Sequence, residues 1–387
     1  MKRFQRISLS VAVALGMLAM VPGAVFAAQP SCGDTLYVNT TLTGDLDCSA
    51  YGGTALYMGK KDLTLNLNGY TIWGPVGDDG QTGVDTSDKK HTTIKNGTIA
   101  NFDTAVYLDQ SVGGTVKNLT LIGEYPTDSN GYGVDVQYGT TNTLNNLTIM
   151  DFYEGVNLYG SANNWITNNH ITGTSYGVYG EYEVGDHIVN NYAEYDYAGF
   201  YEDYNGHQWY EDNTANGDVD GGDYGFYMNC DTYGLIRMIN NTATGNSDYG
   251  FYVYYCYDYY NSSPSNHSLF QGNVANDNDS IGFYDYYSIN GVWQSNTAKR
   301  NGDEGFYMEY PGFVIFKWNI ANRNGSDGIY AYNNYSSIYN FTAFANNKAN
   351  YNDDYGIDGE YGISGASGNI ARHNGNAPDN CYNVDCN

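Results

Sequence analysis

Residues 296–324 read NTAKRNGDEGFYMEYPGFVIFKWNIANRN. One short motif opens and closes this stretch, as NTAKRN at 296–301 and as NIANRN at 319–324. Between the two copies, residues 305–308 read GFYM, a glycine followed by alternating side chains. A motif that returns at a short interval, with an alternating segment inside it, indicates a repeat built from short β-strands.

The asparagine that begins the motif recurs along most of the chain. The spacings between successive copies are 22, 28, 23, 22, 22, 28, 32, 23, 23, 28 and 22. Most repeats thus have nearly the same short length, and the others are longer by a loop. We expect each copy to occupy a turn in the left-handed conformation, with its amide hydrogen-bonded to the copies above and below. The copies are Asn96, Asn118, Asn146, Asn169, Asn191, Asn213, Asn241, Asn273, Asn296, Asn319, Asn347 and Asn369.

A glycine recurs in step with the asparagine and fixes which side chains face inward. The residue after each glycine is predicted to point inward, the next outward and the third inward. Five consecutive repeats place phenylalanine at the first inward position: Phe200, Phe226, Phe251, Phe283 and Phe306. The same repeats place alanine two residues after the landmark asparagine: Ala215, Ala243, Ala275, Ala298 and Ala321. Large side chains on one wall that face small ones on another would fill a narrow interior at native density.

The repeat length decides between architectures. A helical repeat would need helix-forming residues with a period of 3.6, and a leucine-rich repeat would need regular leucines; neither pattern is present. Because parallel strands cannot be joined by tight hairpins, a unit of this length predicts one turn of a β-solenoid with three short strands. We therefore expect an all-β, single-domain parallel β-helix of about 13 coils, roughly 60 Å long at ~4.8 Å per coil. Its predicted parts are a cap segment at 29–52, the helix at 53–375 and a tail at 376–387.

The first 28 residues resemble a secretory signal. Lys2, Arg3 and Arg6 precede an apolar run at 7–20, and residues 25–27 read VFA, a small-residue cleavage site. The alternative is a membrane anchor, but the run is shorter than the ~20 apolar residues that a span needs. We expect an exported protein that is secreted, periplasmic or held at the cell surface, with no membrane span. Removing three basic residues from a net charge of −27 leaves about −30, which argues against nucleic-acid partners.

Six cysteines remain in the mature chain, an even number that suits an oxidising compartment. Cys32 and Cys48 bracket the first mature segment, and Cys381 and Cys386 bracket the last, so the simplest pairing staples each end. Cys230 and Cys256 lie in neighbouring repeats and could form a third bridge.

Several segments resemble a known group of exported proteins. They are CGD at 32–34, LTGDLDC at 42–48, LTLNLNGYTI at 63–72 and the two motifs at 296–301 and 319–324. With the cysteine-bearing tail, they resemble right-handed parallel β-helix repeat proteins with the pectin-lyase-like fold, including NosD-like periplasmic proteins. The resemblance covers nearly the whole mature chain and implies a right-handed solenoid. It leaves the function open, because the fold hosts lyases, hydrolases, epimerases and adhesins.

Catalytic motifs are hard to find. Lyases of this fold need a basic residue, and Arg300 and Arg323 occupy equivalent turns close to Asp303, Glu304 and Asp327, where exposed ion pairs are the simpler interpretation. No catalytic residue is predicted. Asp218, Asp220 and Asp223 form a candidate Ca²⁺ site, with a solvated turn as the alternative. No other cofactor is expected.

Tyrosine sets this chain apart, with 42 copies. The outward residue of seven successive repeats is tyrosine, so stacking of the coils predicts one continuous row on one face. Such a row could bind a glycan, bind a cell-surface partner, mediate self-association or only stabilise the strands. We expect an exported β-helix of structural or binding type, with a polysaccharide lyase or glycoside hydrolase as the alternative. The predicted ligand-binding row is Tyr179, Tyr201, Tyr227, Tyr252, Tyr284, Tyr307 and Tyr330.

Overall fold

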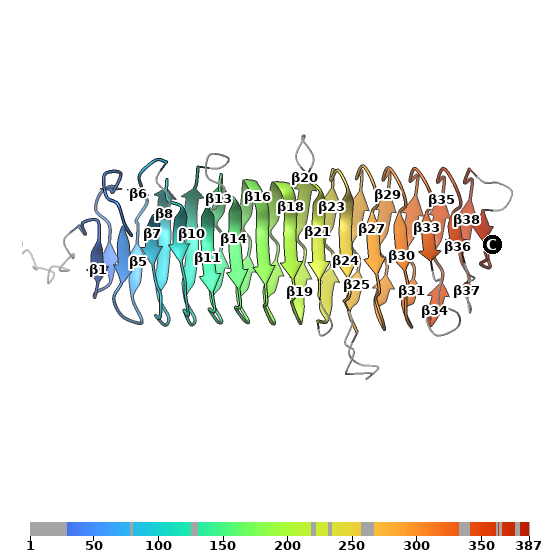
Figure 1. Cartoon of the computed structure of the whole chain (residues 1–387), viewed down its shortest axis with the longest axis horizontal. Coiled ribbons are helices and arrows are strands. Elements are labelled where there is room, and N and C mark those ends of the chain that lie inside the picture. Colours follow the sequence, from blue (N-terminus) through green and yellow to red (C-terminus); the bar gives the residue numbers. More distant parts are fainter. Residues whose placement is uncertain are drawn as a thin grey trace, which may run out of the picture.

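The computed structural model describes residues 29–77, 80–124, 131–217, 222–230, 234–256, 267–332, 341–360, 363, 366–375 and 380–386. The predicted signal segment, residues 1–28, lies outside these ranges. Figure 1 shows one elongated solenoid in which the chain winds steadily from its first strand at one end to its last strand at the other. Among the described residues, no helix has the length and apolar character needed to cross a bilayer.

Every strand pairs in parallel with strands of the neighbouring coils, as the repeat predicts. The register is that of the sequence repeat: Phe226 lies opposite Phe251, and Tyr227 lies opposite Tyr252. Three parallel sheets, here called A, B and C, result from this stacking. Four long strands turn a corner and belong to two sheets each, which joins the three sheets into one hydrogen-bonded network.

Sheet A carries the glycine-led strands. Its members are β1 (Asp34–Leu36), β4 (Leu56–Met58), β7 (Thr82–Asp85), β9 (Thr104–Tyr107), β11 (Tyr132–Gln137), β14 (Glu154–Tyr159), the second half of β16 (His170–Glu181), the second half of β18 (Tyr192–Asp203), β21 (Tyr224–Asn229), β24 (Tyr249–Tyr254), β27 (Phe283–Tyr286), β30 (Phe306–Glu309), β33 (Ile329–Tyr332), β36 (Ile357–Gly359) and β39 (Cys381–Tyr382).

Sheet B follows sheet A in each coil. Its members are β2 (Thr40–Thr41), β5 (Thr64–Asn66), the first halves of β8 (Thr93–Ala100) and β10 (Thr115–Ile122), β12 (Thr143–Asn145), β15 (Trp165–Thr167), β17 (His187–Val189), β19 (Gln208–Glu211), β22 (Ile236–Ile239), β25 (Leu269–Gln271), β28 (Val292–Gln294), β31 (Ile315–Lys317), β34 (Ala343–Ala345) and β37 (Ala366–Ser367).

Sheet C closes each coil. Its members are β3 (Leu46–Asp47), β6 (Thr71–Trp73), the second halves of β8 and β10, β13 (Thr148–Met150), the first halves of β16 and β18, β20 (Thr214–Gly217), β23 (Thr242–Thr244), β26 (Val274–Asn276), β29 (Thr297–Lys299), β32 (Ile320–Asn322), β35 (Lys348–Asn350) and β38 (Ile370–Arg372). Within the described residues, sheets B and C thus have fourteen rungs each. The body is about one coil longer than predicted, because two coils rather than one precede Asn96.

Phenylalanine and alanine fill the interior as predicted. The five phenylalanines form one buried stack, with adjacent ring centroids 4.6–4.7 Å apart and ring planes within 13° of parallel. The alanines of sheet C are fully buried opposite them. The landmark glycine is required at the corner, because a β-carbon on Gly250 would lie 2.9 Å from the Ala275 β-carbon and 2.7 Å from the Gly282 carbonyl oxygen.

From Asn169 onward, the landmark asparagines form a buried hydrogen-bond ladder, which confirms the amide-stacking prediction. In a representative rung, the backbone N–H and the Nδ2 of Asn273 both donate to Oδ1 of Asn296, at 2.9 and 3.1 Å. The same Nδ2 also donates to the Met238 carbonyl at 2.8 Å. Each rung therefore satisfies buried backbone groups that the bend between sheets B and C leaves unpaired.

The predicted left-handed conformation was wrong for these buried asparagines. The residue before each of them takes it instead; Asn168 and Asn190 have φ values of 56° and 55°. The buried asparagine needs its N–H and side chain for the ladder, so its neighbour makes the bend. Asn96, Asn118 and Asn146 do have positive φ. They occupy the left-handed position that Asn168 occupies in its coil, one residue before the buried asparagine. For this reason the step from Asn146 to Asn169 is 23 residues, whereas each of the next two steps is 22.

All three predicted disulfides are present. Cys32 bonds to Cys48 and Cys381 bonds to Cys386, so a bridge lies at each end of the solenoid. Cys230 and Cys256 join two adjacent coils between sheets A and B. Six cysteines therefore form three bridges, and none is free.

Candidate ligand-binding surface

The outer face of sheet A carries the predicted tyrosine row in one straight column. Tyr179 lies opposite Tyr201, which lies opposite Tyr227, and the register continues through all seven coils to Tyr330. The rings are half-buried. The structure thus brings together all seven residues that the repeat singled out.

The rings of the row stack mainly on one another. From Tyr179 to Tyr284, adjacent centroids are 4.5–5.2 Å apart and adjacent planes lie within 13° of parallel. Tyr307 then meets Tyr284 edge to face at 5.2 Å. Because neighbouring rings cover much of each other's faces, the central rungs present hydroxyl groups and ring edges outward. The side of Tyr179 that faces the preceding coil lies opposite Asn157 rather than a ring.

Carboxylates and amides flank the row on the same face. Tyr284 donates its hydroxyl to Glu309 at 2.7 Å, and Tyr330 donates to Glu360. Burial, reinforced by these carboxylates, raises the pKa of both tyrosines well above the usual range. The row therefore stays protonated at physiological pH and can donate hydrogen bonds to a ligand.

The described strands of this face carry no positively charged side chain. No Lys or Arg occurs in any described strand of sheet A, whereas sheets B and C contain Lys95, Lys117, Arg237, Lys299, Lys317, Lys348 and Arg372. The charged side chains are thus distributed unevenly: the described strands of sheet A carry acidic side chains without basic ones, whereas sheets B and C carry both. A surface of this kind repels polyanions and attracts cations.

One pocket opens at the first coil of the row. We call it the Glu154 pocket; its volume is about 360 Å³. Its lining comes from β11, β14 and β16, and comprises Tyr132, Gln137, Glu154, Asn157, Tyr159, Tyr179 and Glu181. Glu154 is 8% exposed, and its Oε2 is buried with no hydrogen-bond partner. Burial first, and then Asp135 and Glu181, raise the pKa of Glu154 to about 8.

Asp135 lies beside this pocket and has its own partners. Its two carboxylate oxygens accept hydrogen bonds from Asn157 Nδ2 and Gln137 Nε2, each at 3.0 Å. Burial nevertheless raises the pKa of Asp135 to about 7, in spite of these two bonds. Two carboxyl groups in adjacent coils are therefore poised to gain or lose a proton near neutrality.

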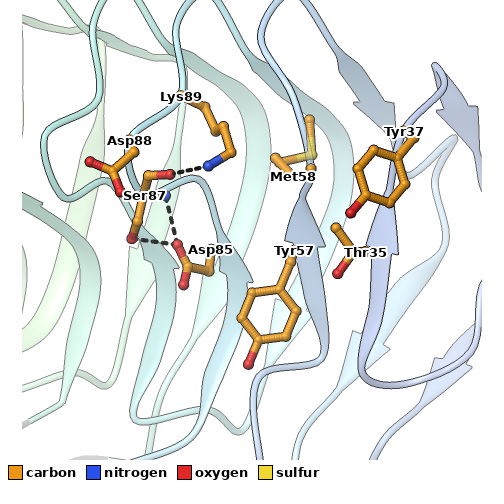
Figure 2. Close-up of a pocket in the computed structure, with 9 residues that line it drawn as sticks. Thr35, Tyr37, Tyr57, Met58, Asp85, Ser87, Asp88 and Lys89 are labelled. Carbon is orange, nitrogen blue, oxygen red and sulfur yellow. Dashed lines mark hydrogen bonds between the residues drawn. The ribbon is translucent and has the colours of Figure 1, made fainter.

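A second pocket, the Asp85 pocket, lies on the same face near the N-terminal end and has a volume of about 330 Å³. Figure 2 shows that Asp85, Ser87 and Lys89 are hydrogen-bonded to one another in a group on one side of it, with Tyr37 and Tyr57 on the other. Ser87 donates to Asp85 through its hydroxyl at 2.6 Å and through its backbone N–H at 2.7 Å. Lys89 donates to the Ser87 carbonyl at 2.8 Å, so a lysine ammonium group lines this acidic pocket.

Other predicted residues are placed as follows. Asp218 and Asp220 lie outside the described residues, and Asp223 accepts a hydrogen bond from the Ser247 hydroxyl at 3.1 Å, so the Ca²⁺ prediction stays untested. Arg300 does form an exposed ion pair, but with Asp277 of the preceding coil rather than with the acids expected. Those acids accept other hydrogen bonds; Ser280, for example, donates to Asp303 at 2.9 Å.

Sequence reasoning missed the Glu154 pocket. The position that Glu154 occupies, directly before the landmark glycine, varies between coils. It is tyrosine in some coils, as at Tyr132 and Tyr224, and a carboxylate in others, as at Glu304 and Asp327. The repeat therefore gave no signal that singled out Glu154, and only the fold shows that it lines a pocket.

A further set of carboxyl groups, Glu183, Asp186 and Glu202, is buried in the interior of neighbouring coils. Asp186 accepts from Asn164 Nδ2 at 3.1 Å, and Gln208 donates to Glu183 at 3.1 Å. Burial raises the pKa of Asp186 to about 6 and raises the pKa of Glu183 and Glu202 more strongly. These groups belong to the core and do not form part of the surface.

Two family models match the chain. Residues 53–226 match the family described as periplasmic copper-binding protein (NosD), and residues 220–375 match the right handed beta helix region. The chain is thus a right-handed parallel β-helix of the pectin-lyase-like kind, as the resemblance implied. A search of curated proteins finds no match.

Solved structures share this fold at low identity. The catalytic domain of a GH87 α-1,3-glucanase in complex with tetrasaccharides is 12% identical, with a TM-score of 0.49 over 89% of this chain and 64% of that one. A mutant of the periplasmic alginate epimerase AlgG is 12% identical, with a TM-score of 0.47 over 90% and 80%. The Dettilon tailspike protein is 12% identical, with a TM-score of 0.47 over 81% and 62%. This chain spans less than two thirds of the tailspike and of the glucanase domain.

The description of the first family names copper, so we asked whether the residues here fit that ion. Copper sites draw on imidazole, thiolate and thioether ligands. All six cysteines form disulfides. In the part of the chain that the structure describes, no three His, Cys, Asp or Glu side chains group so as to hold a metal. These residues do not fit a copper centre.

Proposed function

We propose that this right-handed parallel β-helix is an exported binding protein that holds an extended glycan along the outer face of sheet A. The observation that carries the proposal is the tyrosine row, which is continuous over seven coils. Three disulfides support export, since such bonds persist in oxidising compartments.

The row suits hydroxyl-rich ligands through its polar edge. Its phenol groups donate hydrogen bonds, and the flanking carboxylates such as Glu309 accept them. A sugar chain has donors and acceptors on every residue, so it can pair with both kinds of group along a straight track. Its rungs repeat at 4.5–5.2 Å, which is comparable to the length of one pyranose unit.

Other uses of the face are less well supported. Two copies that met through sheet A would bring two acidic surfaces together, and such like-charge contact opposes association. A lyase would need a base that removes a sugar proton, but the described sheet A strands contribute neither Lys nor Arg. A glycoside hydrolase remains the second candidate, because the Glu154 pocket contains Glu154 and Glu181, and hydrolysis uses a pair of carboxyl groups.

The proposal is tested by titrating the purified protein with neutral, amino-bearing and acidic oligosaccharides in a calorimeter. The key variant replaces Tyr227, Tyr252 and Tyr284 with Phe, which keeps the stack and removes three hydroxyls. We expect about tenfold weaker binding, since lost hydrogen bonds of about 0.5–1.5 kcal/mol each add up to that order. The matched control replaces Tyr51, Tyr192 and Tyr351, which lie off sheet A, with Phe and should bind as the wild type does.

Three results would overturn the proposal: no oligosaccharide binds, the row variant binds as tightly as the control, or the protein releases new reducing or unsaturated ends from a bound glycan. The last result would favour the hydrolase or lyase alternative. A second row variant with Ser at the same three positions removes the rings as well, and circular dichroism establishes that it is folded.

A further inference from the structure

The Glu154 pocket lies at the end of the tyrosine row and differs from the rest of sheet A. Three tyrosines line it, Tyr132, Tyr159 and Tyr179, together with the carboxyl groups of Glu154 and Glu181. Tyr179 is the first rung, and on this side it faces Asn157 instead of another ring. Ring surface that neighbours cover elsewhere in the row therefore remains uncovered by a stacked ring here.

Within this pocket, Glu154 has a carboxyl oxygen without a partner. Its side chain lines the pocket and is more than nine-tenths buried, and its Oε2 has no hydrogen bond. A buried carboxyl oxygen that remains unpaired is costly, and in native structures such an atom needs an explanation. A donor supplied by a ligand is one such explanation, because the neighbouring Asp135 is already satisfied by Asn157 and Gln137.

The Asp85 pocket offers a comparison on the same face. Lys89 lines it together with Asp85, Asp88, Tyr37 and Tyr57, and its ammonium group donates to the Ser87 carbonyl at 2.8 Å (Figure 2). The Glu154 pocket has the same combination of tyrosines and carboxyl groups, and no Lys or Arg lines it. The ammonium group of the Asp85 pocket therefore has no counterpart in the lining of the Glu154 pocket.

We infer that the Glu154 pocket is an ammonium-binding subsite, and that the glycan held along sheet A is a linear amino-sugar polymer. The inference rests on the function proposed above and names the class of its ligand. Carboxylates give an ammonium group charge-assisted hydrogen bonds, and tyrosine rings attract it through their electron-rich faces. Beyond the pocket, Asp203 and Glu309 continue the negative charge along the flank of the row.

Titration of Glu154 gives the subsite a measurable signature. The titratable groups that face Glu154 are Asp135 and Tyr132 of β11 and Tyr176, Tyr179 and Glu181 of β16, none of them cationic. With a pKa raised to about 8, Glu154 carries its proton at pH 6, where the amino groups of an amino sugar are also mainly protonated. A bound ammonium group favours the ionised carboxylate, so binding at this pH releases the Glu154 proton to the buffer.

A lysine-rich peptide has the same ammonium chemistry, but the face suits it less well. Extended peptides usually bind a sheet by pairing with a free edge strand. Along the row, each sheet A strand is paired on both sides; β24, for example, pairs with β21 and β27. The face therefore offers side chains only, which suits a polymer whose own recognition groups are hydroxyls and amines.

The experiment compares three oligomers of matched length at pH 6: glucosamine, N-acetylglucosamine and lysine. Calorimetry in two buffers of different ionisation heat gives both the affinity and the number of protons released. We expect the glucosamine oligomer to bind about tenfold more tightly than its acetylated form and to release a proton. Glu154→Gln should remove this preference and the proton release, whereas Glu194→Gln on sheet C, a matched loss of one charge, should change neither.

The outcomes distinguish failure of the ammonium subsite from failure of the proposed glycan binding. Equal binding of the acetylated and free oligomers, with no proton release from the wild type, overturns the ammonium subsite and leaves glycan binding intact. Failure of both sugar oligomers to bind, when neutral glycans also fail, overturns the proposed function as well. Tighter binding of the lysine oligomer overturns the assignment to amino sugars. The proton measurement on the wild type needs no variant, so it stands even if Glu154→Gln does not fold.

Discussion

Gly225 lies so close to Ala243 that a β-carbon added to the glycine would stand 2.6 Å from the alanine β-carbon. The same added atom would lie 2.5 Å from the Gly250 carbonyl oxygen of the next coil. The glycine and the alanine therefore recur together because each coil leaves room for only one β-carbon at this corner. The stacking of coils turns a steric limit at one position into a repeated feature of the sequence.

Gly225→Ala should destabilise the fold by about 1–3 kcal/mol, the usual range for overpacking a native interior. Urea unfolding followed by circular dichroism measures the change. Gly44→Ala is the matched control, since an added β-carbon there meets nothing within 4 Å. The double variant Gly225→Ala with Ala243→Gly should recover part of the loss, and failure to recover any would mean that the backbone contact dominates.

Asn273→Leu should cost about 2–5 kcal/mol, because the change removes the two bonds that Nδ2 donates and leaves the Asn241 N–H without its acceptor inside the solenoid, where each unpaired group costs about 1–3 kcal/mol. Chemical denaturation measures it. The neighbouring column gives the contrast: Asn168→Gly, at a left-handed position, should change stability by no more than about 0.5 kcal/mol. Similar losses at the two sites would contradict the conclusion that the buried asparagine provides the hydrogen bonds and the residue before it provides the left-handed bend.

Stability should fall as the pH rises from about 4 to about 8. Asp285 points into the core between Val253 and Met308, and burial raises its pKa to about 7. In the unfolded chain this carboxyl ionises near pH 4, so between these values unfolding releases a proton. The stability that the protonated Asp285 carboxyl contributes is complete below its unfolded pKa and is lost as the pH rises through its folded pKa.

Asp285→Asn tests this dependence directly. At pH 8 the variant should be more stable than the wild type by on the order of 3 kcal/mol, and at pH 4 the two should be similar. Thermal melts across the pH range measure the difference. Asp353→Asn, which removes an exposed carboxyl, should leave the slope unchanged; an unaltered slope in the Asp285 variant would show that other groups set it.

Substitutions at Tyr227 test whether the ring or the hydroxyl group stabilises the strands. Its ring stacks at 4.5 Å on Tyr201 and at 5.1 Å on Tyr252. Tyr227→Phe should keep stability within about 0.5 kcal/mol, and Tyr227→Ser should lose about 1–3 kcal/mol, because each aromatic pair contributes about 0.5–1.5 kcal/mol. Differential scanning calorimetry measures both. If the Phe variant lost as much as the Ser variant, the hydroxyl rather than the ring would support the strands.

Much of the architecture could be predicted from the sequence, because stacking makes the repeat visible. The inward Phe200, the inward Ala215 and the outward Tyr227 each follow from strand alternation plus a count along the repeat. The two terminal disulfides were predicted because their cysteines bracket the first and last mature segments, and the third because its cysteines lie in neighbouring repeats. A solenoid is favourable for such reasoning, since each residue contacts mainly its equivalents one coil away.

The bends were harder to predict. Asn301 and Asn324 occupy equivalent places in the two quoted motifs, and they form a second buried ladder in which Asn301 donates to Asn324 at 3.2 and 3.0 Å. Periodicity shows that such residues recur, but it cannot tell which of two adjacent residues takes the left-handed conformation. The Glu154 pocket could not be predicted for a different reason: the position before the landmark glycine varies between coils, so the repeat gave no signal there.

The longer repeats show what nearest-neighbour stacking permits. The step from Asn241 to Asn273 is the longest between successive landmark asparagines, yet Phe251 and Phe283 still meet in register across it. A longer repeat thus keeps its flanking strands in register with those of the neighbouring coils. It follows that the molecule can gain or lose whole coils as units, and each unit would lengthen or shorten the tyrosine track by about 4.8 Å. On the proposed function, the number of coils would set the length of glycan that the row can contact.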